Sequence, residues 1–143
     1  MIKSAAIIAG ALFLAGCVNV RAMPPTVNFG LTCGAGLNET RIADLYFGRN
    51  IGGAFGVDDA EWQAFVNREI TPRFPYGLSI TDVSGQWRGP SGEFVREPSK
   101  AVMVILSGEP DERAKLDAIR AAYVEAFDQD AVMLIQRSAC VGF

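Results

Sequence analysis

The 143-residue chain contains no histidine. This absence excludes Ser-His-Asp and Cys-His nucleophile arrangements, and zinc or haem held by imidazole. Basic side chains are few and scattered, since 13 Lys and Arg stand against 16 Asp and Glu for a net charge of -3. Nucleic-acid binding depends mainly on clustered positive charge, so nucleic acid is not expected as a partner. We therefore nominate no catalytic residue, no cofactor and no metal site.

Long hydrophobic runs are also absent, except near the start of the chain. Residues from Ala5 to Val18 are apolar or small apart from Cys17. This run is shorter than the roughly 20 residues that a membrane-spanning helix needs. With Lys3 ahead of it, the pattern indicates a signal peptide.

The end of this run, Leu14-Ala15-Gly16-Cys17, resembles the bacterial lipoprotein signal. The resemblance implies that residues 1–16 are removed and that the Cys17 thiol receives diacylglycerol. Two or more acyl chains anchor a protein stably where one does not, so the mature chain is expected to stay on a membrane. Val18 after the cysteine, in place of Asp, implies the periplasmic face of the outer membrane. The alternative is an ordinary secretory peptide with a chance cysteine.

The remaining chain divides into a tether and one folded domain. Residues 17–30 have an irregular composition that includes Pro24-Pro25 and predict the lipidated tether. Residues 31–143 fit one compact domain. Within it, Cys33 and Cys140 form an even pair in an oxidising compartment, which predicts a disulfide. The alternative is two buried free thiols.

Hydrophobic periodicity in the folded part predicts six main elements. The order is strand, helix, strand, strand, helix, strand, which is the ferredoxin-like βαββαβ plan of the α+β class, with a four-stranded antiparallel sheet and two helices on one face. We expect strands at 42–50, 78–83, 100–106 and 131–138, and helices over 58–70 and from Pro110 onward. Ser84-Gly85 is expected to form a turn or bulge, 89–92 a hairpin tip with the chain returning through 93–96, and 48–56 a flexible connection.

Two of the expected strands are apolar on both faces. Alternate positions of 101–106 and 132–135 are all hydrophobic, whereas two helices cover only one side of a sheet. An exposed apolar face marks an interface, and ferredoxin-like domains can cover it by pairing into a dimeric α+β barrel. A homodimer is therefore one hypothesis. The alternative is that the glycine-rich loops and the N-terminal segment cover this face.

The densest polar and aromatic positions form a candidate cluster of Arg73, Trp87, Arg88, Arg96 and Glu97. Arginine binds carboxylate or phosphate bidentately, so convergence of these side chains predicts a site for a small anion. The structural alternative is that Arg73 or Arg96 pairs with Glu97 or Asp82 to fix the loop, with Trp87 in the core.

These segments carry a family resemblance. The Trp62/Phe65 helix, the segment from Thr71 to Leu78, Gly85-Gln86-Trp87 and Arg96-Glu97 resemble small bacterial proteins grouped as domain-of-unknown-function family 3574. The resemblance spans roughly 43–140 and implies a fold and a lipoprotein or secreted context, but no activity. The expected function is a lipid-anchored periplasmic binding or scaffolding module, with an envelope protein, a small anion or a second copy as partner. The alternative is a small cofactor-free envelope enzyme on a dimeric barrel.

Overall fold

A computed structural model describes residues 31–89 and 91–143 of the chain. The predicted signal peptide, Cys17 and the whole of the predicted tether lie outside the described residues. The elements in chain order are β1 (Asn38–Gly48), β2 (Asn50–Ile51), β3 (Ala54–Phe55), α1 (Asp59–Phe65), the π-helical turn η1 (Val66–Ile70), β4 (Leu78–Arg88), β5 (Phe94–Leu106), α2 (Glu112–Phe127) and β6 (Met133–Val141). No helix in this part of the chain is both long and apolar enough to cross a membrane.

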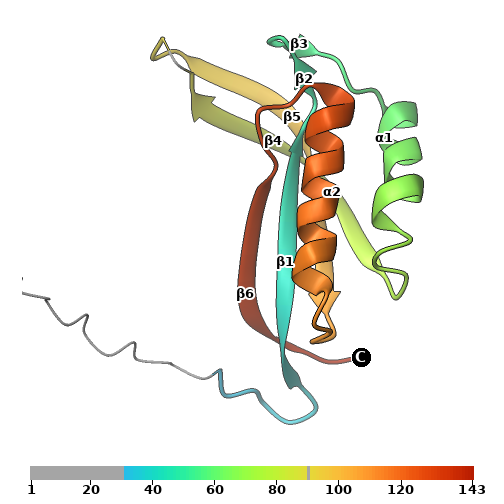
Figure 1. Ribbon diagram of the computed structural model, residues 1–143. Helices are drawn as coiled ribbons and strands as arrows, with labels where there is room; N and C mark the ends of the chain where they lie inside the picture. The colour runs from blue at the N-terminus through green and yellow to red at the C-terminus, as the bar shows by residue number, and fades with distance from the viewer. Residues whose placement is uncertain (1–30, 90) are drawn as a thin grey trace, which may run out of the picture.

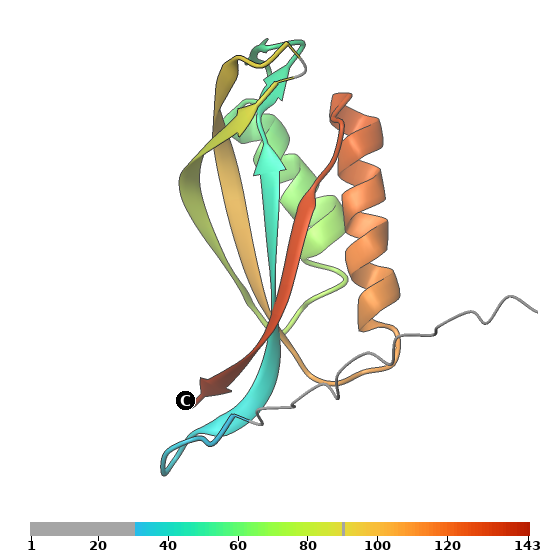
Figure 2. The same cartoon turned by 90° about the vertical axis from the view of Figure 1, so that its left-hand side faces the viewer.

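Four long strands form one antiparallel sheet in the order β4-β5-β1-β6. Helices α1 and α2 both lie on one side of it, as Figures 1 and 2 show from two directions. This arrangement confirms the predicted ferredoxin-like α+β fold. The first and last strands are neighbours, and β2 and β3 form a separate small hairpin within 48–56.

Local sequence signals explain where α1 begins. The Asp58 carboxylate accepts the Glu61 backbone N–H at 2.8 Å, and the Glu61 carboxylate accepts the Asp58 N–H at 3.0 Å, forming the predicted capping box. The helical segment ends at Ile70. Thr71 still has helical backbone angles, φ -55° and ψ -43°, but Pro72 has no N–H and cannot donate the next helical hydrogen bond.

The core lies between the sheet and the two helices. Ala43, Leu45 and Phe47 on β1 are fully buried against α2 residues such as Ile119 and Tyr123. Phe47 lies at the centre of an aromatic group, with ring centroids 5.1 Å from Trp62, 6.1 Å from Phe65 and 4.8 Å from Tyr123. Among the described residues, every buried side-chain nitrogen and oxygen has a hydrogen-bond partner. The described interior therefore leaves no buried polar side chain without a hydrogen bond.

The predicted disulfide between Cys33 and Cys140 is present, with the two Cα atoms 5.5 Å apart. Cys140 lies near the end of β6, opposite Glu39 at the start of β1. The bond therefore ties the segment that precedes the first strand to the last strand.

The structure corrects several predicted boundaries. Ser84-Gly85 forms no turn, because β4 continues through it to Arg88. The strand predicted at 100–106 begins at Phe94, since each residue from 94 to 98 pairs with β4. Helix α2 begins at Glu112 rather than near Pro110, and β6 ends at Val141 rather than Ser138.

Candidate functional site

The side of the sheet away from the helices is uncovered by any other element among the described residues, and we call it the open face. Cross-strand pairs place alternate residues of all four strands on it. Its exposed apolar side chains are Met133 (54% exposed), Trp87 (46%), Ile135 (40%) and Ile105 (37%). Ala101, Met103 and Val83 lie between them and are partly buried. The open face is thus a continuous, largely apolar surface.

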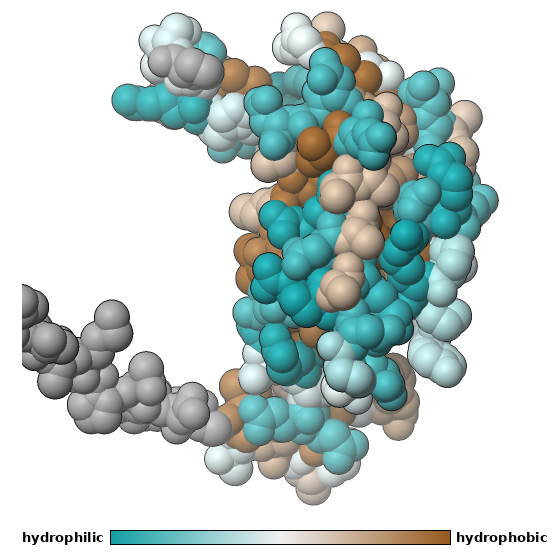
Figure 3. Space-filling model, in the orientation of Figure 1, coloured by the Kyte–Doolittle hydropathy of each residue, from teal (hydrophilic) through white to brown (hydrophobic). Residues whose placement is uncertain are grey.

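One end of the sheet extends beyond the helix layer as a two-stranded arm, residues 84–89 and 91–98. Strand β1 pairs with β5 only from Ser99 onward. Backbone N–H groups of Arg49 and Asn50 bond to Pro98 and Glu97 at the base of the arm, whereas the outer pairs Trp87–Val95 and Arg88–Phe94 have no third strand paired with them. Figures 1 and 2 together show that the arm bends out of the sheet on the side of the open face. Figure 3 shows this side of the molecule hollowed beneath the arm.

Charge on the open face is small and paired. Arg137 on β6 donates to the carboxylate of Asp44 on β1, and Asp44 is itself buried. Glu97 is the remaining charged residue on this face. The face therefore presents no strong charge of either sign to a partner.

Glu97 is a buried carboxyl at the base of the arm, only 6% exposed. One carboxylate oxygen accepts the Asn50 backbone N–H at 2.8 Å. The carboxylate lies directly over Gly48, where a Cβ atom would come within 2.5 Å of it, so a larger residue at this position of β1 would displace the carboxylate. No Lys or Arg within 31–89 or 91–143 forms an ion pair with it. Burial raises the pKa of Glu97, and the hydrogen bonds from backbone N–H groups oppose that rise.

The raised pKa of Glu97 predicts a pH-dependent stability. Because burial disfavours the charged form, the folded protein prefers protonated Glu97. The stability that protonated Glu97 provides is complete below the pKa of the unfolded chain, near 4.5, and is lost as the pH rises through the pKa of the folded protein. We expect Glu97→Gln to unfold at a higher temperature than the wild type at pH 7 and to lose this advantage by pH 4. Thermal unfolding across this pH range measures the difference. Glu125→Gln, an exposed position on α2, controls for the lost charge, and an equal gain there would contradict the assignment.

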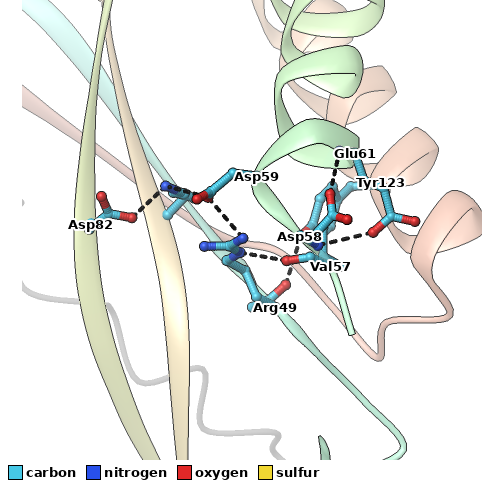
Figure 4. Close-up of polar contacts among 9 residues, drawn as sticks. Arg49, Val57, Asp58, Asp59, Glu61, Asp82 and Tyr123 are labelled. Carbon is cyan, nitrogen blue, oxygen red and sulfur yellow. Dashed lines mark hydrogen bonds and ion pairs between the residues drawn. The ribbon is translucent and has the colours of Figure 1, made fainter. Parts of the chain in front are cut away.

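A second polar group lies on the helix side of the sheet and fastens α1 to the strands. Lys100 is nearly buried and contacts Asp82 at 2.5 Å and Asp59 at 3.4 Å. Arg49, also buried, donates to the Val57 carbonyl at 2.7 Å and pairs with Asp59 at 2.9 Å. Figure 4 shows these side chains converging from β4, α1 and the segment after β1.

The ion pairs of this second group stabilise the contact between α1 and the strands. The hydrogen bond to Asp82 is the main cause of the raised pKa of Lys100, and the hydrogen bond from Lys100 is the main cause of the lowered pKa of Asp59. Nearby, the Tyr123 hydroxyl donates to the Gly48 carbonyl at 2.7 Å, and burial raises the pKa of Tyr123. Each cation here already has a carboxylate partner, so the group offers no free positive charge to a ligand.

The structure removes Arg73 from the predicted anion cluster and leaves the other four residues on the arm. Arg73 precedes β4 and pairs with Glu69 at 2.8 Å, whereas Trp87 and Arg88 end β4. At ~3.3 Å per strand residue, the two ends of β4 are roughly 30 Å apart. Arg96 donates to Gln86 at 3.1 Å, and Arg88 lies over the Phe94 ring at 5.6 Å.

The ion pairs that the structural alternative predicted also differ from those in the structure. Arg73 pairs with Glu69 rather than Glu97 or Asp82, and Asp82 pairs with Lys100. Trp87 is half-exposed on the arm rather than in the core. Within the cluster, Arg96 and Glu97 are adjacent but point to opposite sides of β5, because successive strand residues alternate.

An open groove of about 1130 Å³ lies at the other end of the sheet. Residues 72–79 form one wall, and Pro110 and Phe143 contribute to others. Its buried acid, Glu112, is already occupied by the Ser107 hydroxyl and by the backbone N–H groups of Ser107 and Gly108. The described residues contain no group of three or more Cys, Asp or Glu that could hold a metal ion.

The prediction from sequence missed Arg49, Asp59 and Lys100. Lys100 carried a signal, because a lysine at the head of an intensely apolar strand needs a carboxylate partner when it is buried. Arg49 carried none, since it stands in a segment that composition predicts to be a loop.

The fold and open face define a small α+β domain of the ferredoxin-like class. The chain belongs to the family described as protein of unknown function (DUF3574), whose sequence profile matches residues 42–143. No curated protein sequence matches it.

Solved structures with a similar fold include a phage SAM lyase. In complex with S-methyl-5'-thioadenosine, that lyase is 18% identical with a TM-score of 0.57, over 79% of this chain and 95% of its own. The apo structure of the phage SAM lyase is 20% identical with a TM-score of 0.55, over 80% of this chain and 97% of its own. CutA from Synechococcus elongatus is 14% identical with a TM-score of 0.50, over 76% of this chain and 87% of its own. At these identities the likeness shows the fold alone.

Proposed function

We propose that the protein is a lipid-anchored periplasmic binding module, held on the outer membrane by acylated Cys17, whose open face packs against a second copy. The observation that carries the proposal is the open face itself, which is broad, apolar and not covered by any other described element. In the described part of the chain every buried polar side chain is already hydrogen-bonded, which also favours a binding role over an enclosed reaction site.

The anchor is supported by the order of Lys3, the apolar run and Leu14-Ala15-Gly16-Cys17. The disulfide between Cys33 and Cys140 fits an oxidising compartment such as the periplasm. Labelling cells with radioactive palmitate tests the anchor. We expect the wild type to be labelled and Cys17→Ser to remain unlabelled; equal labelling would refute lipidation.

The size and charge of the open face suit a second copy. Four strands at ~4.8 Å spacing and about nine residues at ~3.3 Å each present roughly 600 Å² of projected area. A stable dimer buries about 800 Å² of accessible surface per copy, and a corrugated face has more accessible than projected area. Asp44 and Arg137 neutralise each other within one copy, and Glu97 is buried. Two such faces therefore meet without strong repulsion between like charges.

Light scattering on the full-length protein, extracted in detergent and corrected for bound detergent, tests the assembly. We expect the wild type to have the mass of a dimer. Ile135→Glu, which places a charge on the open face at the edge strand β6, is expected to give a monomer with unchanged circular dichroism. Ala121→Glu, at an exposed position of α2 on the other side of the sheet, is the matched control. A wild type that stays monomeric at high concentration would refute the assembly.

A small cofactor-free enzyme is the second candidate, favoured by Glu97. A buried carboxyl without a cation partner among the described residues is a candidate acid or base, and the phage SAM lyase shares the fold. Incubation of the protein with SAM, followed by chromatography for S-methyl-5'-thioadenosine, tests this candidate. Product that Glu97→Gln no longer forms would support it, and no product above the protein-free control counts against it.

A further inference from the structure

The arm, residues 84–89 and 91–98, has more exposed aromatic surface than its own fold requires. Trp87 is 46% exposed and Phe94 is 65% exposed. Asn50 of β2 contacts the base of the arm at Glu97 and Arg96, but no third strand of the described chain pairs with the outer part, where Trp87 and Phe94 lie. A two-stranded ribbon alone is marginally stable in water. A projecting ribbon with an exposed tryptophan is therefore suited to contact something outside its own chain.

The two aromatic residues lie on opposite sides of the arm. Trp87 pairs with Val95, two positions along β4 from the Gly85–Glu97 pair, so Trp87 lies on the same side as Glu97 and the open face. Phe94 pairs with Arg88 and lies on the other side, where the Arg88 guanidinium covers its ring at 5.6 Å. Because the arm bends toward the open face (Figure 1), the side of the arm that carries Trp87 is its inner side.

We propose that the arm is a clasp, in which Trp87 of each copy packs against the open face of the other copy. This inference rests on the dimer of the proposed function and names the residue that anchors it. In an isologous pair the same patch serves both copies, so each arm reaches around its partner while the two sheets face each other.

A second copy is the occupant that the observations favour. The inner side of the arm continues directly into the open face, so a body that covers this face also lies beneath Trp87. The arm is electrically balanced, with Arg88 and Arg96 against Glu93 and Glu97, and selects for neither an acidic nor a basic partner. Tryptophan is enriched among the residues that dominate binding energy at such contacts.

Sedimentation or light scattering across a dilution series of the detergent-extracted full-length protein measures the effect. We expect Trp87→Ala to raise the dimer dissociation constant ~10-fold or more, and Trp87→Phe to have a smaller effect because it keeps an aromatic ring. Phe94→Ala is the matched control, an exposed aromatic residue on the outer side of the same arm, and is expected to stay within about twofold of the wild type.

Tryptophan fluorescence gives a second measurement that needs no destabilising variant. The chain has two tryptophans, Trp62 at 3% exposure and Trp87. Quenching by acrylamide should be weak in the concentrated dimer and should rise on dilution as Trp87 becomes exposed. Trp87→Phe reports Trp62 alone and should show no such rise.

The outcomes separate the clasp from the dimer. If Ile135→Glu gives monomers while Trp87→Ala dimerises as tightly as the wild type, the clasp is wrong and the proposed dimer stands. Quenching of Trp87 that is equal in dimer and monomer also overturns the clasp. A wild type that is monomeric throughout overturns both proposals.

Discussion

Replacing Cys140 with serine should lower the free energy of unfolding by about 4 kcal/mol, because the Cys33–Cys140 bond closes a loop with a sequence separation of 107. Chain-entropy models give ~4.7 kcal/mol for a loop of that length, and measured effects are often smaller. The bond restrains β6, an edge strand that pairs only with β1. Urea unfolding of the wild type and Cys140→Ser measures the loss.

The two cysteines should act as one unit. We expect Cys33→Ser to lose as much stability as Cys140→Ser, and the double variant to lose no more than either single variant. The unfolding midpoint of the wild type should fall to the same value when a thiol reductant is added. A midpoint that the reductant leaves unchanged would show that the disulfide does not form in the protein.

Several elements could be predicted from sequence because local chemistry determines them. The Asp58/Glu61 capping box and the helical spacing of Trp62 and Phe65 identified α1 without any knowledge of its neighbours. The apolar run from Ala101 to Leu106 likewise identified the inner part of β5. Chain order then limited the topology to few plans, because consecutive elements usually lie side by side.

The arm could not be predicted in this way. Glycine, here Gly85, is typical of turns, and proline, here Pro98, is rare within strands. Composition alone therefore predicts several short strands in place of the long strands β4 and β5. Their continuity comes from cross-strand pairs such as Gln86–Arg96, which no local pattern contains. Cross-strand contacts of this kind override intrinsic propensity.

The candidate site was predicted in outline and not in detail. Hydrophobic residues on both sides of the β5 pattern correctly indicated an apolar face that no other described element covers. The anion cluster assumed that Arg73 meets Arg88 and Arg96, but a strand of this length holds its two ends apart. Glu97 appeared in that cluster as a charge partner, whereas in the structure it is buried and its carboxylate accepts the Asn50 backbone N–H.

Phe47→Ala should destabilise the fold by about 3–5 kcal/mol, the usual range for removing a buried phenylalanine. Phe47 is fully buried on the central strand β1, and its ring contacts Trp62, Phe65 and Tyr123. The surrounding rings are held by α1 and α2, so the cavity left by the missing ring can collapse only in part. Urea unfolding, followed by near-ultraviolet circular dichroism of the aromatic residues, measures the loss.

Phe94→Ala removes the same ring from a position that is 65% exposed, and exposed substitutions usually change stability by less than about 0.5 kcal/mol. The difference between these two variants therefore isolates the contribution of burial at Phe47. Similar losses for both would contradict a core centred on Phe47. A small loss at Phe47 alone would mean that α1 and α2 move in to fill the space, which their position against β1 and the hydrogen bond from Tyr123 to the Gly48 carbonyl oppose.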